Sequence, residues 1–287
     1  MTTTCSGVHH TGASRKTARL FSTVSRDANV VRMRVAVVGK GGAGKSVIAG
    51  TMARLVARRG TPVLVLDSDP LPGLSLSLGS GPAPDEPPLR QAVRQDENGR
   101  WGWCEGITPA IAAQRFSTGA PDGVRLLQSG KTGRDGRRPV PGASNGFWEV
   151  AHGLVHAPEF RDWALIGDLP GGPSQPAADW APYAETYLVV VQPTVQSALT
   201  ARRVAKLARM HSPSAAIAYV ANRIEHEDEV RHVERLLDEP VFASLPADAD
   251  VAAAERIGAA PIDHAPDSAA IAAIERLIAA LEGAARP

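Results

Sequence analysis

The sequence predicts an α/β fold, a doubly wound and mostly parallel sheet with helices on both faces in a Rossmann-like three-layer sandwich. A glycine-rich loop at Gly39–Ser46 lies between an apolar strand pattern and a helical pattern, which together form a strand–loop–helix unit. Further strands are continuous aliphatic runs, as in parallel sheets that helices cover on both faces. Strand and helix patterns then alternate toward the end of the chain, and this alternation predicts the doubly wound topology.

The first element is a buried strand at residues 35–38 that runs into the glycine-rich loop. Glycines let consecutive backbone N–H groups point at an anion, and the N-terminus of the following helix adds partial positive charge. In such a phosphate-binding loop (P-loop), Lys45 reaches the β- and γ-phosphates of a nucleotide, and Ser46 ligates Mg²⁺. The expected nucleotide-binding residues of this stretch are Gly39, Lys40, Gly41, Gly42, Ala43, Gly44, Lys45, Ser46 and Val47.

The helix after the loop is expected to run to about Arg59, where a glycine follows. Its basic side chains Arg54, Arg58 and Arg59 are expected on the outer side of the helix. Residues 61–67 then form a second buried strand, which places acidic side chains at its carboxyl end. Open α/β sheets bind their ligands at that end, so we expect functional residues there.

The middle of the chain departs from this alternation. A polar, proline-rich stretch begins near residue 81, and we expect a variable insertion over about residues 80–145. Loops of that length in compact domains are usually functional or disordered. Within the insertion, a strand is expected at residues 124–127 and a mobile basic loop at residues 131–138.

Regular alternation resumes after the insertion. Strands are expected at residues 163–168, 186–191, 217–220 and 241–245, and helices at residues 145–155, 195–210, 228–237, 251–257 and 268–281. The last helix carries apolar side chains at helical spacing, which is typical of core packing. Asp168 ends one of the strands, and Asn222 closes another.

Composition limits the classes of function. The 287-residue chain has 44% hydrophobic and 21% charged residues and a formal charge of +1, which argues against a strongly polyanionic partner. Two cysteines are too few for a zinc or iron–sulfur site within one chain, and no apolar run has the length of a membrane span. We therefore expect a cytoplasmic protein without membrane insertion.

Residues 1–32 are expected to be a disordered N-terminal extension, and residues 33–287 one P-loop domain. The extension is rich in threonine, serine and basic residues, a composition that superficially suits a transit peptide or a basic arm. Met33 stands directly before the first strand, where a shorter chain would begin. We assign the extension no function.

The sequence Lys40-Gly-Gly-Ala-Gly-Lys45-Ser resembles the deviant phosphate loop of the MinD/ParA superfamily, which includes the nitrogenase iron protein and CooC-type ATPases. In that family the first lysine reaches across a dimer interface to the other subunit's nucleotide, so that ATP switches dimerisation. The resemblance implies a slow Mg²⁺-dependent ATPase in which Lys40, Lys45 and Asp69 are catalytic. A second cation would stabilise charge that develops on the transferred phosphate. The alternative for Lys40 is a solvated loop residue.

Two acidic motifs extend the resemblance. Asp67-Ser-Asp69-Pro resembles the family's first switch segment, in which the second aspartate orients the attacking water and the first lies nearer the Mg²⁺ shell. Asp168-Leu-Pro-Gly171-Gly resembles the Walker B and second switch segment. The resemblance implies that Asp168 holds Mg²⁺ through water, together with Ser46 and Asp67, and that the Gly171 amide senses the γ-phosphate. The alternative for Asp67 and Asp69 is that each caps a turn.

The base-binding residues are the weaker part of the match. Asn222 corresponds to the asparagine whose amide reads the adenine edge in relatives, and Pro246, in Pro-Ala-Asp, to the loop that completes the base pocket. The resemblance covers about residues 33–287, and residues 80–145 match poorly.

The sequence lacks some residues of the family, and their absence limits the functions that we expect. The cysteines that hold the iron–sulfur cluster of the nitrogenase iron protein, and the Cys-x-Cys of CooC-like proteins, are missing from the corresponding stretches, so we expect no iron–sulfur cluster or metal carriage. The expectation is an ATP-dependent homodimer that acts on a protein client in an accessory or maturation role like that of CooC-type proteins. The alternative is a ParA-like positioning or regulatory module that binds DNA or a partner protein. Its candidate DNA-contacting residues are Arg202, Arg203, Lys206 and Arg209. A kinase or synthetase stays open, although Lys40 argues against it.

Overall fold

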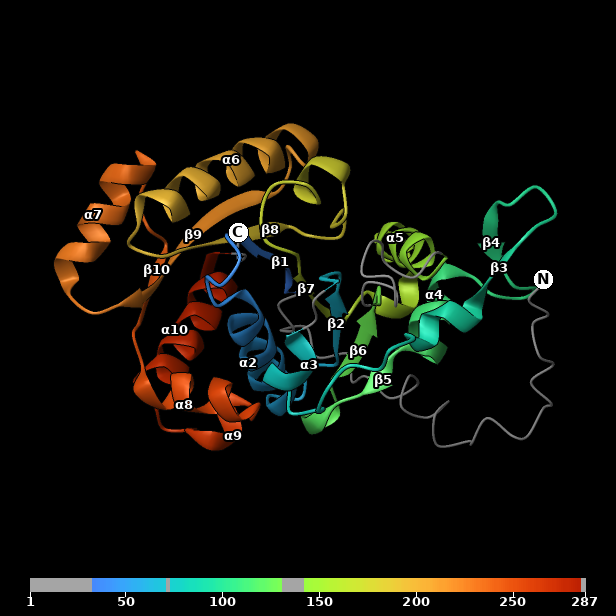
Figure 1. Ribbon diagram of the computed structural model, residues 1–287, viewed down its shortest axis with the longest axis horizontal. Coiled ribbons are helices and arrows are strands. Elements are labelled where there is room, and N and C mark those ends of the chain that lie inside the picture. Colours follow the sequence, from blue (N-terminus) through green and yellow to red (C-terminus); the bar gives the residue numbers. More distant parts are fainter. Residues whose placement is uncertain (1–32, 71–72, 131–141, 285–287) are drawn as a thin grey trace.

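The computed structural model describes residues 33–70, 73–130 and 142–284 (Figure 1). Its centre is an eight-stranded sheet in the order β10-β9-β8-β1-β7-β2-β6-β5. Neighbouring strands are parallel except for β5 and β6, which are antiparallel. The strands are β1 (Arg34–Gly39), β2 (Val63–Asp67), β5 (Thr118–Gly119), β6 (Arg125–Gln128), β7 (Ala164–Asp168), β8 (Thr186–Val191), β9 (Ala216–Ile224) and β10 (Ala243–Pro246). This architecture confirms the predicted doubly wound fold.

Helices cover both faces of the sheet (Figure 1). They are α2 (Lys45–Arg58), α3 (Leu74–Ser77), α4 (Pro109–Phe116), α5 (Ala143–Gly153), α6 (Val195–His211), α7 (Glu227–Leu237), α8 (Ala249–Ile257), α9 (Pro261–His264) and α10 (Ala269–Ala284), with short 3₁₀ helices η1 (Pro88–Ala92), η2 (Pro121–Gly123), η3 (Pro158–Phe160) and η4 (Pro176–Ala178). Among the helices of the described ranges, none has the length and apolar character needed to cross a membrane.

Alternating side chains of the strands divide the core into two halves. In β1, Ala36 and Val38 pack in one hydrophobic cluster with α5, α6 and α7, whereas Val35 and Val37 pack in another with α2 and α10. Every residue of β1 is buried, because the strand lies between β7 and β8 and beneath both helical layers. The glycine-rich loop therefore leaves the sheet from a fully buried strand.

The region from residue 80 to residue 145 contributes to this sheet. Its strand β6 pairs in parallel with β2, with Leu66 opposite Leu127, and β5 forms the sheet edge. The same region contains helix α4 and a two-stranded hairpin of β3 (Val93–Gln95) and β4 (Trp101–Trp103), and the sequence pattern predicts neither of them. The expected basic loop at residues 131–138 and the extension at residues 1–32 lie outside the described residues.

Two local expectations are wrong. Strand β9 continues to Ile224, because β10 supplies paired residues as far as Pro246, and Asn222 therefore lies inside the strand instead of closing it. Arg54, expected on the outer side of its helix, is only 3% exposed. Its partners Asp122 and Asp263 are distant in sequence, so no local pattern reveals the burial.

Candidate functional site

Two adjoining cavities open at the carboxyl ends of the central strands. The loop cavity, of about 610 Å³, is lined by the glycine-rich loop from Gly41 onward together with Asp69 and Gly171. The side cavity, of about 530 Å³, is lined by the end of β9 and by residues around Pro246. The two cavities share the lining residues Gly44, Val47, Arg223 and Glu255. An elongated ligand can therefore extend from one cavity into the other.

The backbone of the loop depends on glycine at specific positions. Gly39 has a φ of +145°, and a Cβ atom there would lie 2.4 Å from the carbonyl oxygen of Val190. Gly44, with a φ of +93°, would place a Cβ atom 2.4 Å from the side-chain nitrogen of Asn222. A Cβ atom on Gly171 would lie 2.6 Å from the backbone nitrogen of Gly41. Bare backbone thus lines a cradle in which N–H groups can face an anion.

Ser46 and Asp168 meet beneath this cradle. The Ser46 hydroxyl donates a hydrogen bond of 2.6 Å to Oδ2 of Asp168, which is fully buried at the end of β7. Oδ1 of Asp168 has no hydrogen-bond partner among the described residues. Burial raises the pKa of Asp168 to about 6, although the Ser46 hydrogen bond and the charge of Lys45 oppose the increase. An unpaired carboxylate oxygen beside a hydroxyl is an oxygen donor set that suits Mg²⁺.

Asp67 supports this pair from the neighbouring strand. Asp67 of β2 and Asp168 of β7 are partners in the sheet register, so their side chains share the same strand ends. Gln128 donates to Oδ2 of Asp67 at 3.2 Å, and the backbone N–H of Asp69 donates to Oδ1 at 3.2 Å. Burial, followed by the charge of Asp168, raises the pKa of Asp67 well above its usual range. Asp67 therefore orients Asp69, which lines the loop cavity.

The two lysines of the loop point in different directions. Lys45 is buried and lines the loop cavity, where its Nζ donates to the carbonyl oxygen of Lys40 at 3.4 Å. Nζ of Lys40 instead donates to Oε1 of Gln196 at 3.3 Å, near the start of α6. Among the described residues that line the two cavities, Lys40 does not occur. Lys40 thus points away from the cavity that its own loop forms.

Asn222 and Pro246 lie together in the side cavity. The Asn222 side chain donates a 2.7 Å hydrogen bond to the carbonyl oxygen of Ala43, so it also ties β9 to the loop. Gly39 and Ala43 belong to the loop, but neither is among the described residues that line the loop cavity or the side cavity. The structure therefore brings the loop, the acidic strand ends, Asn222 and Pro246 to one edge of the sheet.

Some residues that line or support the site were not predicted from the sequence. Arg223 lines both cavities, has a φ of +60° and forms an ion pair of 3.3 Å with Glu255 of α8. Its position after Asn222 is a weak signal, and no motif marks Glu255. Gln128 and Gln175, which hold Asp67 and Ser68, are also unmarked because their partners are distant in sequence.

Comparisons with known proteins agree with this geometry. A family model described as the CobQ/CobB/MinD/ParA nucleotide binding domain matches residues 35–262. An ATP-binding protein of Methanocaldococcus jannaschii is 28% identical over 257 residues, covering 85% of this chain and 96% of its own. The carbon monoxide dehydrogenase accessory protein CooC of Rhodospirillum rubrum is 25% identical over 249 residues, covering 82% of this chain and 91% of its own.

Solved structures give the same fold. The septum site-determining protein MinD of Pyrococcus horikoshii, in complex with Mg-ADP, superposes with a TM-score of 0.65 at 16% identity, covering 89% of this chain and 98% of its own. At that identity the likeness concerns the fold alone. It places the described chain among proteins with the same arrangement of sheet, loop and helices.

Proposed function

The chain belongs to the CobQ/CobB/MinD/ParA nucleotide-binding family, and we propose that it is a slow, Mg²⁺-dependent ATPase whose ATP-bound form dimerises and acts on a protein client. The observation that carries the proposal is the Ser46–Asp168 pair beneath the glycine cradle, with one carboxylate oxygen unpaired in the described part of the chain. The two connected cavities support a nucleotide as the ligand, because one end of the site is rich in loop amides and the other is mainly apolar.

In the proposed reaction, water attacks the γ-phosphorus of ATP, and the bond to the β–γ bridging oxygen breaks to give ADP and phosphate. Loop amides and Lys45 hold the phosphates, and Asp69 orients the water. Ser46 and Asp168 would hold Mg²⁺, which, when bound, supplies positive charge to the phosphate oxygens. Asn222 and Pro246 border the side cavity, which would take the base.

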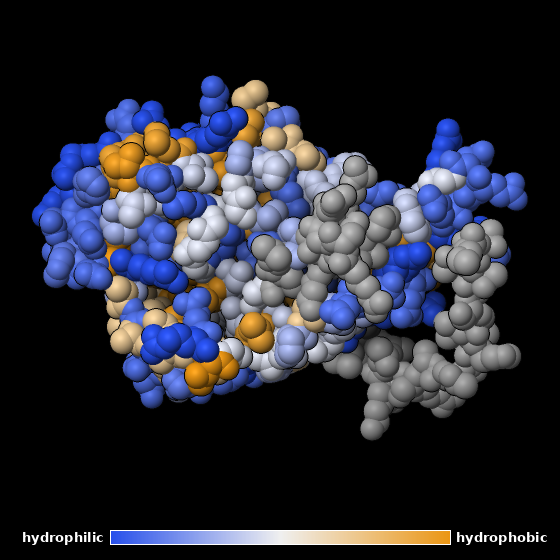
Figure 2. Space-filling view, in the orientation of Figure 1, coloured by the Kyte–Doolittle hydropathy of each residue, from blue (hydrophilic) through white to orange (hydrophobic). Residues whose placement is uncertain are grey.

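The orientation of Lys40 supports action across a dimer interface. Its side chain leaves its own loop cavity and lies at the start of α6, where it is available to a second copy of the chain. Its partner Gln196 lies beside Val195 and near Leu199, which are 55% and 60% exposed. Figure 2 shows apolar side chains over this region among hydrophilic ones. Exposed apolar side chains beside a functional lysine are typical of a contact surface between proteins.

A protein client is proposed from the relatives. CooC is described as an accessory protein of carbon monoxide dehydrogenase, and this chain resembles it over most of both lengths. Hydrolysis would reset the protein through a conformational change of the two segments that begin at Asp67 and Asp168.

DNA binding is the second candidate function. Arg202, Arg203 and Lys206 are exposed along α6, as a phosphate-binding surface requires. Arg209, however, pairs with Glu239 through a 2.9 Å hydrogen bond, which removes one charge from that surface. Replacing Arg202, Arg203 and Lys206 by alanine distinguishes the two roles, because loss of nonspecific DNA retention favours DNA binding and unchanged retention favours the client.

The test of the proposed ATPase is phosphate release by the purified protein with ATP and Mg²⁺. Wild type should hydrolyse ATP slowly, and Lys45→Ala should lose the activity because the loop lysine that holds the phosphates is gone. Lys206→Ala, which removes an exposed lysine of α6, is the control and should keep wild-type turnover. A folded wild-type protein that neither binds nor hydrolyses ATP would contradict the proposal.

A further inference from the structure

Ser68 lies between Asp67 and Asp69, and it is held by a residue from a distant segment. The Ser68 hydroxyl lies 2.6 Å from Oε1 of Gln175, and Nε2 of Gln175 donates to the carbonyl oxygen of Ser68 at 3.1 Å. Ser68 is 3% exposed and Gln175 is half-buried, so both hydrogen bonds are partly shielded from solvent. We name this reciprocal pair the Ser68–Gln175 clasp.

The orientation of the Gln175 amide follows from its neighbours. Because Nε2 of Gln175 faces a carbonyl oxygen, its Oε1 faces the Ser68 hydroxyl and accepts a hydrogen bond from it. The carbonyl oxygen of Asp168 lies 3.1 Å from the same hydroxyl, and it accepts from the Ser68 backbone N–H at 3.1 Å. The clasp therefore joins the segment of Asp67–Asp69 to the segment that follows Asp168.

The clasp holds the peptide unit that joins Ser68 to Asp69. The carbonyl group of Ser68 and the N–H group of Asp69 belong to the same planar peptide. The N–H group donates to Asp67 at 3.2 Å, and the carbonyl group accepts from Gln175 at 3.1 Å. Both ends of this peptide are thus fixed, and the peptide leads directly into Asp69 in the loop cavity.

The segment that carries Gln175 is also held at its far end. Nε1 of Trp148 donates to the carbonyl oxygen of Ala178 at 3.3 Å, and Nε2 of His152 lies 3.0 Å from the carbonyl oxygen of Asp179. Trp148 and His152 both belong to α5, and their ring centroids are 3.8 Å apart. Gln175 is therefore supported by a helix outside the nucleotide site, which gives it a stable position from which to hold Ser68.

We propose that Gln175 is a positioning residue for ATP hydrolysis, which acts through Ser68 to hold Asp69 in place over the loop cavity. This inference rests on the proposed ATPase function. Catalytic groups displaced by about 1 Å can lose about a hundredfold in rate, whereas binding contacts elsewhere are unaffected. Loss of the clasp should therefore lower kcat and leave KM for ATP nearly unchanged, since the phosphates and the base are held by other residues.

The kinetic test compares Gln175→Leu, Ser68→Ala and the double variant with wild type. We expect each single change to lower kcat at least about tenfold with KM within about twofold, because one displaced carboxylate controls the chemical step. The double variant should lose little more than either single variant, because both remove the same clasp. Gln95→Leu is the control, since its Nε2 makes a comparable hydrogen bond to Gly99 in the β3–β4 hairpin. A kcat within twofold of wild type in folded Gln175→Leu overturns the proposal.

A second measurement does not depend on turnover. In the nucleotide-free protein, the backbone amide of Asp69 should exchange its hydrogen at least about tenfold faster in Gln175→Leu than in wild type, because its peptide is no longer fixed at the carbonyl end. Gln95→Leu should leave that rate unchanged, and an unchanged rate in Gln175→Leu contradicts the clasp. An inactive wild type would refute the ATPase, while the exchange rate would still decide whether Gln175 positions Asp69.

Discussion

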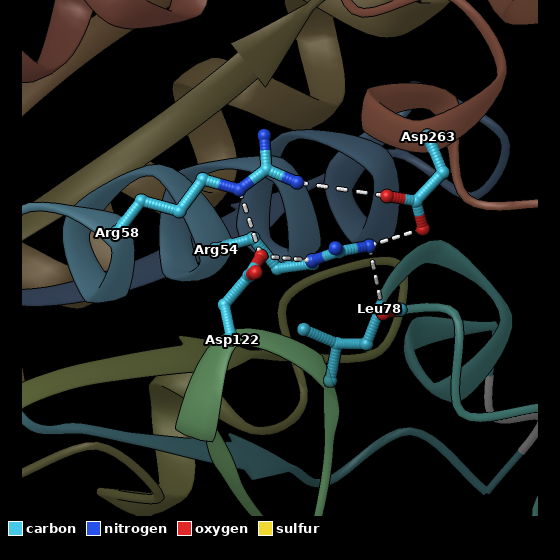
Figure 3. Close-up of polar contacts among 5 residues, drawn as sticks. All are labelled: Arg54, Arg58, Leu78, Asp122 and Asp263. Atoms are coloured by element: carbon cyan, nitrogen blue, oxygen red, sulfur yellow. Dashed lines mark hydrogen bonds and ion pairs between the residues drawn. The ribbon is translucent and has the colours of Figure 1, made fainter.

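Arg54, whose side chain is only 4% exposed, forms an ion pair with the partly exposed Asp122, with Nε and Oδ2 separated by 2.7 Å (Figure 3). Arg54 also donates to Asp263 of α9 and to the carbonyl oxygen of Leu78, and Arg58 donates to the same oxygen of Asp122 at 2.9 Å. The helix of the glycine-rich loop is thereby joined to α9, to η2 and to the end of α3.

This network predicts a large cost for removing Asp122. Asp122→Ala leaves the buried Arg54 guanidinium with Asp263 and the Leu78 carbonyl alone, so the free energy of unfolding should fall by about 1–3 kcal/mol. Urea unfolding measures the change. Arg59→Ala is the control, because its pair with Glu282 at 3.6 Å is at the surface and its loss should cost less than about 1 kcal/mol. Equal losses in the two variants would mean that Asp122 does not stabilise the buried Arg54.

The ion pair between Arg54 and Asp122 also predicts that the free energy of unfolding depends on pH. Burial raises the pKa of Asp122, but the hydrogen bonds from Arg54 and Arg58 outweigh it and hold the pKa below its usual value. A lowered pKa in the folded state gives stability that is present above the unfolded pKa of about 3.9 and is lost as the pH falls through the folded value. The difference in unfolding free energy between wild type and Asp122→Asn should thus be constant from pH 7 to 5 and shrink below pH 4. A difference that stays the same at pH 3 would argue against the ion pair.

The Ser46–Asp168 pair predicts that Asp168→Asn loses the contribution of Mg²⁺ to ATP binding. An amide cannot replace the charge of the carboxylate, so ATP affinity in the presence of Mg²⁺ should fall about tenfold to a hundredfold. In EDTA the variant and wild type should bind ATP about equally. Titration calorimetry with and without Mg²⁺ measures both affinities, and Asp228→Asn at the exposed start of α7 is the control. If Mg²⁺ raised the ATP affinity of Asp168→Asn and of wild type by the same factor, Asp168 would not be a residue that holds the metal.

Gly171 offers a steric test of the cradle. A methyl group at this position would lie 2.6 Å from the Gly41 backbone nitrogen, so Gly171→Ala should weaken ATP binding by about tenfold or more. Gly102→Ala, for which no atom lies within 4 Å of the added carbon, should bind as wild type does. Both proteins should unfold at similar temperatures, which separates a local effect from misfolding. Wild-type affinity in Gly171→Ala would mean that ATP does not use the Gly41 amide.

Local patterns in the sequence predict most of the central sheet. The aliphatic runs of β1, β2, β7 and β8 are each buried on both faces, so their composition alone identifies them. Strands β3 and β4 have three residues each and form by pairing with each other, as Val93 does with Trp103. Neither contains a run of apolar residues from which a strand could be predicted. The extension of β9 likewise depends on its neighbour β10.

The residues of the candidate site that belong to sequence motifs were predictable. The carboxyl ends of parallel strands meet at one edge, so Asp67 and Asp168 are expected together, and they are partners in the register. The supporting residues were not predictable, because Gln175 is 107 residues from Ser68 and Asp263 is 209 residues from Arg54. Such contacts exist only after the chain has folded.

The most direct test of the ATP-driven dimer is the mass of the protein in solution with and without ATP, measured by light scattering for wild type, Lys40→Ala and Asp69→Ala. Asp69→Ala should bind ATP without hydrolysing it and remain a dimer, whereas Lys40→Ala should stay monomeric and inactive, because the partner's phosphate loses its second cation. Lys206→Ala should behave as wild type. A mass that does not depend on nucleotide in wild type, Lys40→Ala and Asp69→Ala would contradict the account.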